Sequence, residues 1–182
     1  MSARTGQIRF KAKLLRPAAP RGTTWTFVLL PMAASRKLPT RSMVTVDGML
    51  DGHAFQATLE PDGQGGHWLK VDKALREAAN IIVGDTVTLA IAPVDVEPEP
   101  KVPADLRKAL VANSAASVPW HEITPAARRD WIHWITSGKK AETRERRIRT
   151  ACDMLTAGKR RACCFDRSGI YSKAFCAPNA AE

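Results

Sequence analysis

The stretch VTVDGMLDGHAFQATLE, residues 44–60, decides the fold of the first half of the chain. Apolar residues alternate with polar ones on either side of Asp51-Gly52, and a period of two is typical of half-buried strands. An Asp-Gly pair between two such runs favours a tight two-residue hairpin turn. The stretch therefore predicts two antiparallel strands joined at Asp51-Gly52.

Four further segments around this hairpin have a strand-like pattern. They are IRFKAKLL at 8–15, TWTFVLL at 24–30, HWLKV at 67–71 and TVTLAI at 86–91. One helix interrupts the series, with Asp72 placed to cap its N-terminus. Closure removes the exposed edges of a sheet, so six short strands favour a small closed or partly open β-barrel capped by that helix. The residues expected to fill its interior are Ile8, Phe10, Phe27, Val46, Phe55 and Leu89, and Trp25 and Leu29 are expected on the same face of their strand as Phe27.

The second half of the chain follows a proline-rich acidic segment, PVDVEPEPKVP at 93–103, which predicts an extended linker. Beyond it the apolar period changes from two to 3.6, as in amphipathic helices. A first short helix is expected to bury Leu106, Leu110 and Val111, and a second one ends near Trp120.

Two longer helices are predicted after these. Thr124 can cap the first of them, with Pro125 at its first position and Gly138 at its end. The last helix spans about 141–157 and stops at Gly158. The expected organisation is an α+β chain with a barrel at 1–92, a linker at 93–103, a helical unit at 104–162 and a Cys-containing tail at 163–182, whose small polar end is expected to fray.

The two halves resemble two bacterial families. The segments FKAKLL, TWTFVLLP and VGDTVTLAI, with the hairpin stretch, resemble the DUF1905 family, whose members are similar in architecture to the double-split β-barrels of the AbrB/MazE class. The segments VPADLRKALVANSAA and WIHWITSGKKAETRERRI resemble the family labelled bacteriocin-protection, YdeI or OmpD-associated. The first resemblance implies a double-split-barrel-like fold, and the second implies a role in tolerance of antimicrobial peptides.

Positive charge is concentrated near the end of the chain. The 182 residues carry 28 Lys and Arg against 18 Asp and Glu, a net charge of +10, and residues 139–173 hold eleven of these cations and four of the acids. Exposed cations at this density attract phosphates. The candidate anion-contacting residues are Lys139, Lys140, Arg144, Arg147, Arg160 and Arg161. Nucleic acid, either DNA or RNA, is the favoured partner, while a nucleotide, a lipid headgroup, an acidic protein or a merely solvated helix face stay open.

The four cysteines are too few and too clustered for a disulfide-based secreted fold. Cys163, Cys164 and Cys176 lie near basic residues that favour the thiolate, but their spacing lacks a CxxC pair. They are weak candidates for a metal or redox site. The sequence predicts no metal and no cofactor.

No motif in the sequence supports catalysis. The four histidines have no recognised ligand spacing, and the glycine-rich turn at 62–66 lacks the Lys-Ser/Thr of a phosphate loop. We therefore predict a non-enzymatic binding protein. No apolar run approaches the roughly 20 residues of a membrane span, and the first residues lack the apolar core of a signal peptide, so a cytoplasmic location is expected.

Two alternative functions stay open at this point. One is a stress-tolerance protein that acts through a protein partner, as the second resemblance implies. The other is a small-molecule site or an enzyme at the mouth of the barrel, which would need a pocket with convergent polar groups.

Overall fold

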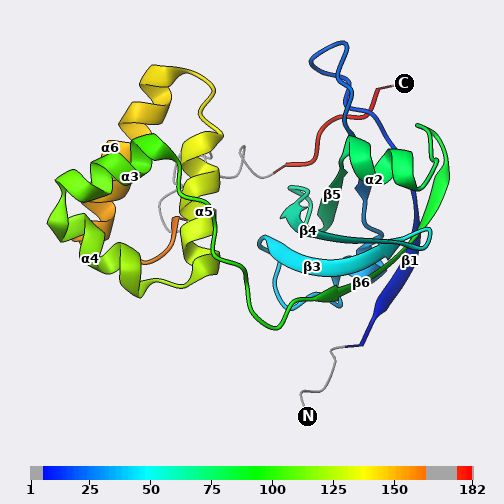
Figure 1. Cartoon of the computed structure of the whole chain (residues 1–182), viewed down its shortest axis with the longest axis horizontal. Coiled ribbons are helices and arrows are strands. Elements are labelled where there is room, and N and C mark those ends of the chain that lie inside the picture. Colours follow the sequence, from blue (N-terminus) through cyan, green and yellow to red (C-terminus); the bar gives the residue numbers. More distant parts are fainter. Residues whose placement is uncertain (1–5, 163–175, 182) are drawn as a thin grey trace. The chain divides into compact units, whose positions relative to one another are not determined.

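The computed structural model describes residues 6–162 and 176–181. It divides into two compact units: a barrel unit, which contains residues up to Val96 and the last described residues, and a helical unit, which begins at Glu97 (Figure 1). The α+β class and the order of barrel before helices, both predicted from the sequence, are confirmed.

The barrel unit is a six-stranded antiparallel sheet that is nearly closed. Its strands are β1 (Ile8–Lys13), β2 (Thr26–Leu29), β3 (Val44–Leu50), β4 (His53–Pro61), β5 (His67–Val71) and β6 (Thr86–Pro93), in the order β1-β6-β3-β4-β5-β2. Leu15, just after β1, and Phe27 of β2 exchange two backbone hydrogen bonds of 2.8 and 2.9 Å. Because these bonds join the two ends of the strand order, the sheet curls into a barrel and hides most of its edges.

The β3–β4 hairpin forms as predicted. Leu50 faces His53 across a two-residue turn, and both turn residues have positive φ, 43° at Asp51 and 87° at Gly52. This is the conformation that favours an Asp-Gly pair in a tight hairpin. The Asp51 carboxylate also accepts a 2.9 Å hydrogen bond from the backbone N–H of Thr88 in β6, which links the turn to the neighbouring strand.

The barrel interior is packed with apolar side chains. Its buried core includes Ile8, Leu14, Val28, Leu30, Val44, Val46, Leu50, Leu59, Leu69, Val71, Val87, Leu89 and Ile91, with Phe10 and Phe55 partly buried against it. Five of the six residues expected in the interior therefore belong to or pack against this core.

The prediction for β2 was wrong about which face points inward. Val28 and Leu30 enter the core, whereas Phe27, although fully buried, packs on the opposite face, with its ring centroid 6.1 Å from that of Trp25 and 6.0 Å from that of Trp68. Leu29 is 42% exposed. Both faces of this strand are apolar, so a period of two cannot decide which face is inside.

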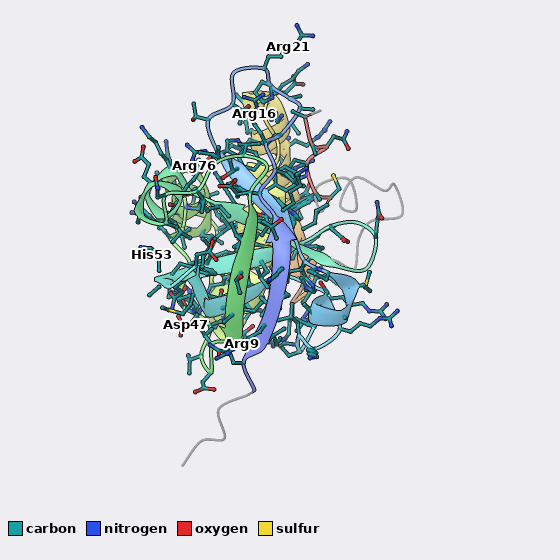
Figure 2. The ribbon with its side chains drawn as sticks, turned by 90° about the vertical axis from the view of Figure 1, so that its right-hand side faces the viewer. Arg9, Arg16, Arg21, Asp47, His53 and Arg76 are labelled. Carbon is teal, nitrogen blue, oxygen red and sulfur yellow. The ribbon has the colours of Figure 1, made fainter. Side chains whose placement is uncertain are left out.

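Short helices and the end of the chain complete the barrel unit. Helix α1 (Met32–Ser35) follows β2, and α2 (Lys73–Ala78) is capped by Asp72, whose side chain accepts a hydrogen bond from the Leu75 N–H at 2.8 Å. Figure 2 shows Arg16 and Arg21 on the loop that leads from β1 toward β2.

The last described residues do not fray, contrary to the prediction. Ala181 N–H donates to the Arg16 carbonyl at 2.7 Å, and Asn179 accepts from the N–H of Ala18 at 2.8 Å. A further bond of 3.1 Å runs from the Ala177 N–H to the carbonyl of Asp62. Backbone pairing of this kind needs no apolar side chain, so the composition of the tail gave no sign of it.

The described part of the helical unit, residues 97–162, contains four helices. They are α3 (Ala104–Ala112), α4 (Ser114–Glu122), α5 (Pro125–Thr136) and α6 (Ala141–Thr156). Thr124 caps α5 as predicted, and the chain turns at Gly158 with φ of 80°. The core consists mainly of Leu106, Leu110, Ala116, Trp120, Ala127, Trp131, Ile135, Ile148, Ala151, Cys152 and Leu155. Val111 was expected inward but is 81% exposed, because Leu106 and Leu110 already define the buried stripe of α3.

No helix among the described residues is both long and apolar enough to cross a membrane.

Candidate anion-binding surface of the helical unit

Arg144 of α6 is bound within the helical unit. Its guanidinium holds the Asp105 carboxylate of α3 through two bonds, one from Nε to Oδ2 and one from Nη2 to Oδ1, the latter at 3.0 Å. This fork geometry is the strongest form of an Arg–carboxylate pair. The hydrogen bonds from Arg144 hold the pKa of the Asp105 carboxyl below its usual range. Arg144 therefore joins α6 to α3.

Arg147 is also committed to contacts inside the unit. Its Nη1 donates to the carbonyl of Trp134 at 2.5 Å and to Ser137 Oγ at 2.7 Å, and its guanidinium lies 5.4 Å from the centroid of the Trp134 ring. The Trp134 carbonyl belongs to the last turn of α5, where carbonyls have no partner within the helix. Arg147 thus bonds one carbonyl at the C-terminal end of α5, which also accepts a 2.8 Å hydrogen bond from Ser137 Oγ.

The solvent-facing side of α6 carries both signs of charge. Arg146 and Arg149 are exposed there together with Glu142, Glu145 and Asp153. A 3.5 Å ion pair joins Arg149 to Glu145. The acids outnumber the cations on this side, while Arg144 and Arg147, which helical spacing places together, are partly exposed and bound to α3 and α5.

The other four candidate residues lie near the two ends of α6. Lys139 and Lys140 are exposed in the turn before the helix, while Arg160 and Arg161 are exposed just after it. Arg160 forms a 3.1 Å ion pair with Glu122, but both side chains are more than half exposed, and such pairs hold a side chain only weakly. A helix of 16 residues is about 24 Å long, so the structure separates these two basic pairs.

A largely buried charge cluster on α5 was not predicted from the sequence. Arg129 donates to Glu97 at 2.6 Å and lies 3.6 Å from Asp130, and all three side chains are less than a quarter exposed. Beside them, Arg128 donates to Glu99 at 2.8 Å. Burial raises the pKa of the Asp130 carboxyl. The available signal was the acidic composition of the segment 93–103, which predicts an extended linker; two of its acids, Glu97 and Glu99, instead pair with the neighbouring arginines of α5.

These ion pairs leave the surface of the unit positively charged. Residues 97–162 contain fourteen Lys and Arg against eight Asp and Glu. Six of those acids already hold an arginine of the same unit, and they are Glu97, Glu99, Asp105, Glu122, Asp130 and Glu145. The exposed lysines of the α5–α6 turn therefore have few acids left to neutralise them.

The structure describes only two of the four cysteines, Cys152 and Cys176. Cys163 and Cys164 lie outside the described residues, and Cys176 is exposed. Cys152 is buried in the helical core, and burial raises the pKa of its thiol, which favours the unreactive protonated form. Among the residues described, no three His, Cys, Asp or Glu side chains are grouped so that they could hold a metal ion.

The alternative of a small-molecule or enzyme site at the barrel mouth needs a pocket with convergent polar groups. One groove on the barrel can be compared with that requirement. It has a volume of about 790 Å³ and is lined partly by Asp47, Gly48, Phe55 and Gln56. Gln56 donates to the Asp47 carboxylate at 2.8 Å, and a Cβ atom on Gly48 would come within 2.6 Å of the Phe55 ring. Figure 2 shows Asp47 on the outer side of the barrel. Two of the polar side chains that line this groove, Asp47 and Gln56, are thus bound to each other.

Comparison with known families agrees with the division of the chain. Residues 10–91 match the family model described as a domain of unknown function, DUF1905. Residues 99–158 match the family model described as bacteriocin-protection, YdeI or OmpD-associated. These matches confirm the two resemblances seen in the sequence. A search of curated proteins gives no match to the chain.

Proposed function

The chain joins a DUF1905 domain to a bacteriocin-protection, YdeI or OmpD-associated domain, and we propose that it is a non-enzymatic protein that binds a nucleic acid through its helical unit. The observation that carries the proposal is the pair of exposed cations at each end of α6. Lys139 and Lys140 form one pair and Arg160 and Arg161 form the other. Arg144 and Arg147, which are bound within the unit, act as positioning residues.

The separation of the two pairs favours a long anion over a small one. The 16-residue helix that runs between them is about 24 Å long, and duplex DNA places a phosphate every 3.4 Å on each strand. A stretch of about seven phosphates on one strand therefore covers that distance. A single nucleotide or a lone phosphate reaches only one pair. A cytoplasmic location, where DNA and RNA are both present in a bacterial cell, is part of this proposal.

Neutralising the turn before α6 should reduce both affinity and salt dependence. In Lys139→Gln/Lys140→Gln, we expect the slope of log affinity against log salt concentration to become shallower by about two, because each lost phosphate contact removes about one released counterion. The measurement is a fluorescence-anisotropy titration with duplex DNA, single-stranded DNA and RNA over a series of salt concentrations.

The matched control is Lys11→Gln/Lys13→Gln, which removes the same charge from exposed positions on β1. It should leave the slope close to that of the unchanged chain. Equal losses in both variants would mean that only the total charge matters. Absent or salt-insensitive binding to all three nucleic acids would refute the proposal.

A second candidate function comes from the description of the matched helical family, which names bacteriocin protection. Direct capture of a cationic peptide is disfavoured for a chain of net charge +10, because like charges oppose encounter. Such a role would therefore act through a protein partner. A strain lacking the gene should then survive exposure to cationic peptides less well than its parent, and identical survival curves would remove this candidate.

A further inference from the structure

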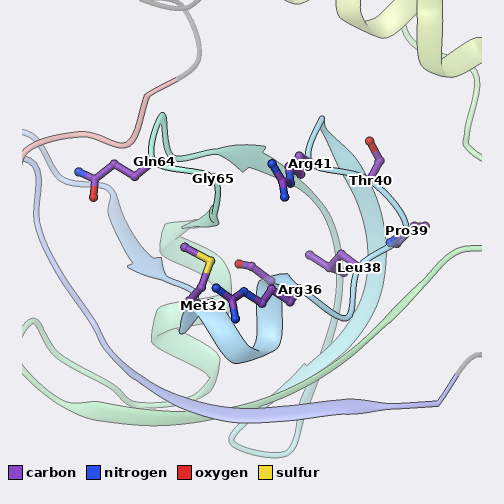
Figure 3. A pocket seen from close by; sticks show the side chains of 9 residues that line it. Met32, Arg36, Leu38, Pro39, Thr40, Arg41, Gln64 and Gly65 are labelled. Carbon is purple, nitrogen blue, oxygen red and sulfur yellow. The ribbon is translucent and has the colours of Figure 1, made fainter.

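The barrel unit contains a pocket that plays no part in the nucleic-acid binding proposed for the helical unit. It has a volume of about 410 Å³, within the usual range for small-molecule sites, and Arg36 and Arg41 both line it. Arg36 follows α1 and Arg41 lies in the loop before β3. Figure 3 shows the two arginine side chains entering this space from these two segments, with Gly65 of the β4–β5 loop beside them.

One buried histidine fixes both arginine-bearing segments. The backbone N–H of His67 donates to Ser35 Oγ at 3.1 Å, and its ring Nε2 lies 3.0 Å from the carbonyl of Ser42. His67 is 1% exposed, and burial lowers the pKa of its ring, so the neutral ring donates from Nε2 to that carbonyl. Ser35 precedes Arg36 and Ser42 follows Arg41. The two chain segments that carry the arginines are therefore both bound to a single residue of β5.

The charge of the two arginines is not neutralised nearby. Among the described residues, neither guanidinium has a hydrogen-bond or ion-pair partner, and both side chains belong to exposed residues. The loop that brings Gly65 to the pocket contains one acid, Asp62. Its Oδ1 accepts hydrogen bonds from the backbone N–H groups of Gln64 and Gly66 at 2.7 and 2.8 Å. Asp62 is thus engaged in shaping the loop.

We propose that this pocket binds the phosphate group of a small phosphate monoester between Arg36 and Arg41. Guanidinium groups recognise phosphate oxygens through paired hydrogen bonds, and two of them match the two negative charges of a monoester. Met32, which is 40% exposed, and Pro39 also line the pocket and offer apolar surface to the organic part of the ligand. This site goes beyond the proposed function, because it belongs to the barrel unit and takes one small ligand.

The test is a titration of the full chain with phenyl phosphate and with inorganic phosphate, followed by amide NMR shifts. We expect the largest shifts in residues 36–41 and 64–66. Arg36→Gln and Arg41→Gln should each weaken phenyl phosphate binding by tenfold or more. Arg36→Lys and Arg41→Lys keep the charge but lose the paired geometry, so their losses should be smaller but clear.

Lys37→Gln is the matched control, because Lys37 is an exposed cation next to Arg36 that does not line the pocket. A parallel arm uses vesicles that contain phosphatidic acid, whose headgroup is also a phosphate monoester. Arginine-dependent binding of phenyl phosphate supports a soluble ligand, and arginine-dependent binding of vesicles alone supports the lipid headgroup.

The proposal would be overturned if neither phenyl phosphate nor the vesicles showed arginine-dependent binding. It would also be overturned if Lys37→Gln weakened binding as much as the arginine variants do. The chain with Lys139→Gln/Lys140→Gln should bind phenyl phosphate like the unchanged chain. A failure of the nucleic-acid proposal is therefore distinguishable from a failure of this one.

Discussion

Arg129→Ala is expected to destabilise the helical unit by about 3–5 kcal/mol, enough to unfold a marginally stable unit. The Arg129 side chain is 13% exposed and holds Glu97 and Asp130, which are 24% and 13% exposed. Its removal takes an ion-pair partner from two largely buried carboxylates. The measurement is urea unfolding followed by far-ultraviolet circular dichroism, which reports on the helices.

Arg149→Ala is the control for this prediction. The Arg149 side chain is 71% exposed, and its partner Glu145 is equally accessible to water. An exposed pair within one helix contributes about 0.3–0.5 kcal/mol, so this variant should unfold almost like the unchanged chain. Similar small losses in both variants would show that the cluster around Arg129 does not hold the unit together.

Arg147→Glu is expected to cost about 3 kcal/mol or more, while the same change at its neighbour Arg146 should cost less than about 0.5 kcal/mol. The substitution at Arg147 removes the bonds to the Trp134 carbonyl and Ser137 Oγ. It also places a carboxylate at the negative end of the α5 dipole. Arg146 is exposed and faces solvent. Thermal unfolding of the two variants provides the comparison.

This difference matters for any binding experiment on α6. A loss of anion binding in Arg147→Glu would follow from unfolding, whatever the role of the surface. Binding measured on Arg146→Glu, which should stay folded, separates the two causes. If Arg147→Glu is as stable as Arg146→Glu, then Arg147 is not a positioning residue. It is then again a candidate for direct contact with the anion.

The strands and helices could be predicted because their signals are local. The alternation around Asp51-Gly52 specifies a hairpin, and Thr124-Pro125 specifies a helix start, with no knowledge of distant residues. The face of β2 could not be predicted, since Phe27 and Val28 are equally apolar and only the closed sheet decides which one points inward.

The candidate site was only partly accessible from the sequence for a similar reason. Helical spacing places Arg144 and Arg147 on one side of α6, but it does not say whether that side faces water. Asp105 lies 39 residues before Arg144 in the sequence, and their pairing depends on how α3 packs against α6. The pocket between Arg36 and Arg41 had no sequence motif, because His67 of β5 brings its two segments together.

The central claim, that the helical unit binds a nucleic acid, is tested most directly by purifying the full chain with its cellular partners, with and without nuclease treatment. We expect nucleic acid to co-purify, to be released by added salt and to be largely lost from Lys139→Gln/Lys140→Gln but retained by Lys11→Gln/Lys13→Gln. A preparation free of nucleic acid, whose bound proteins are unchanged by nuclease, would contradict the claim.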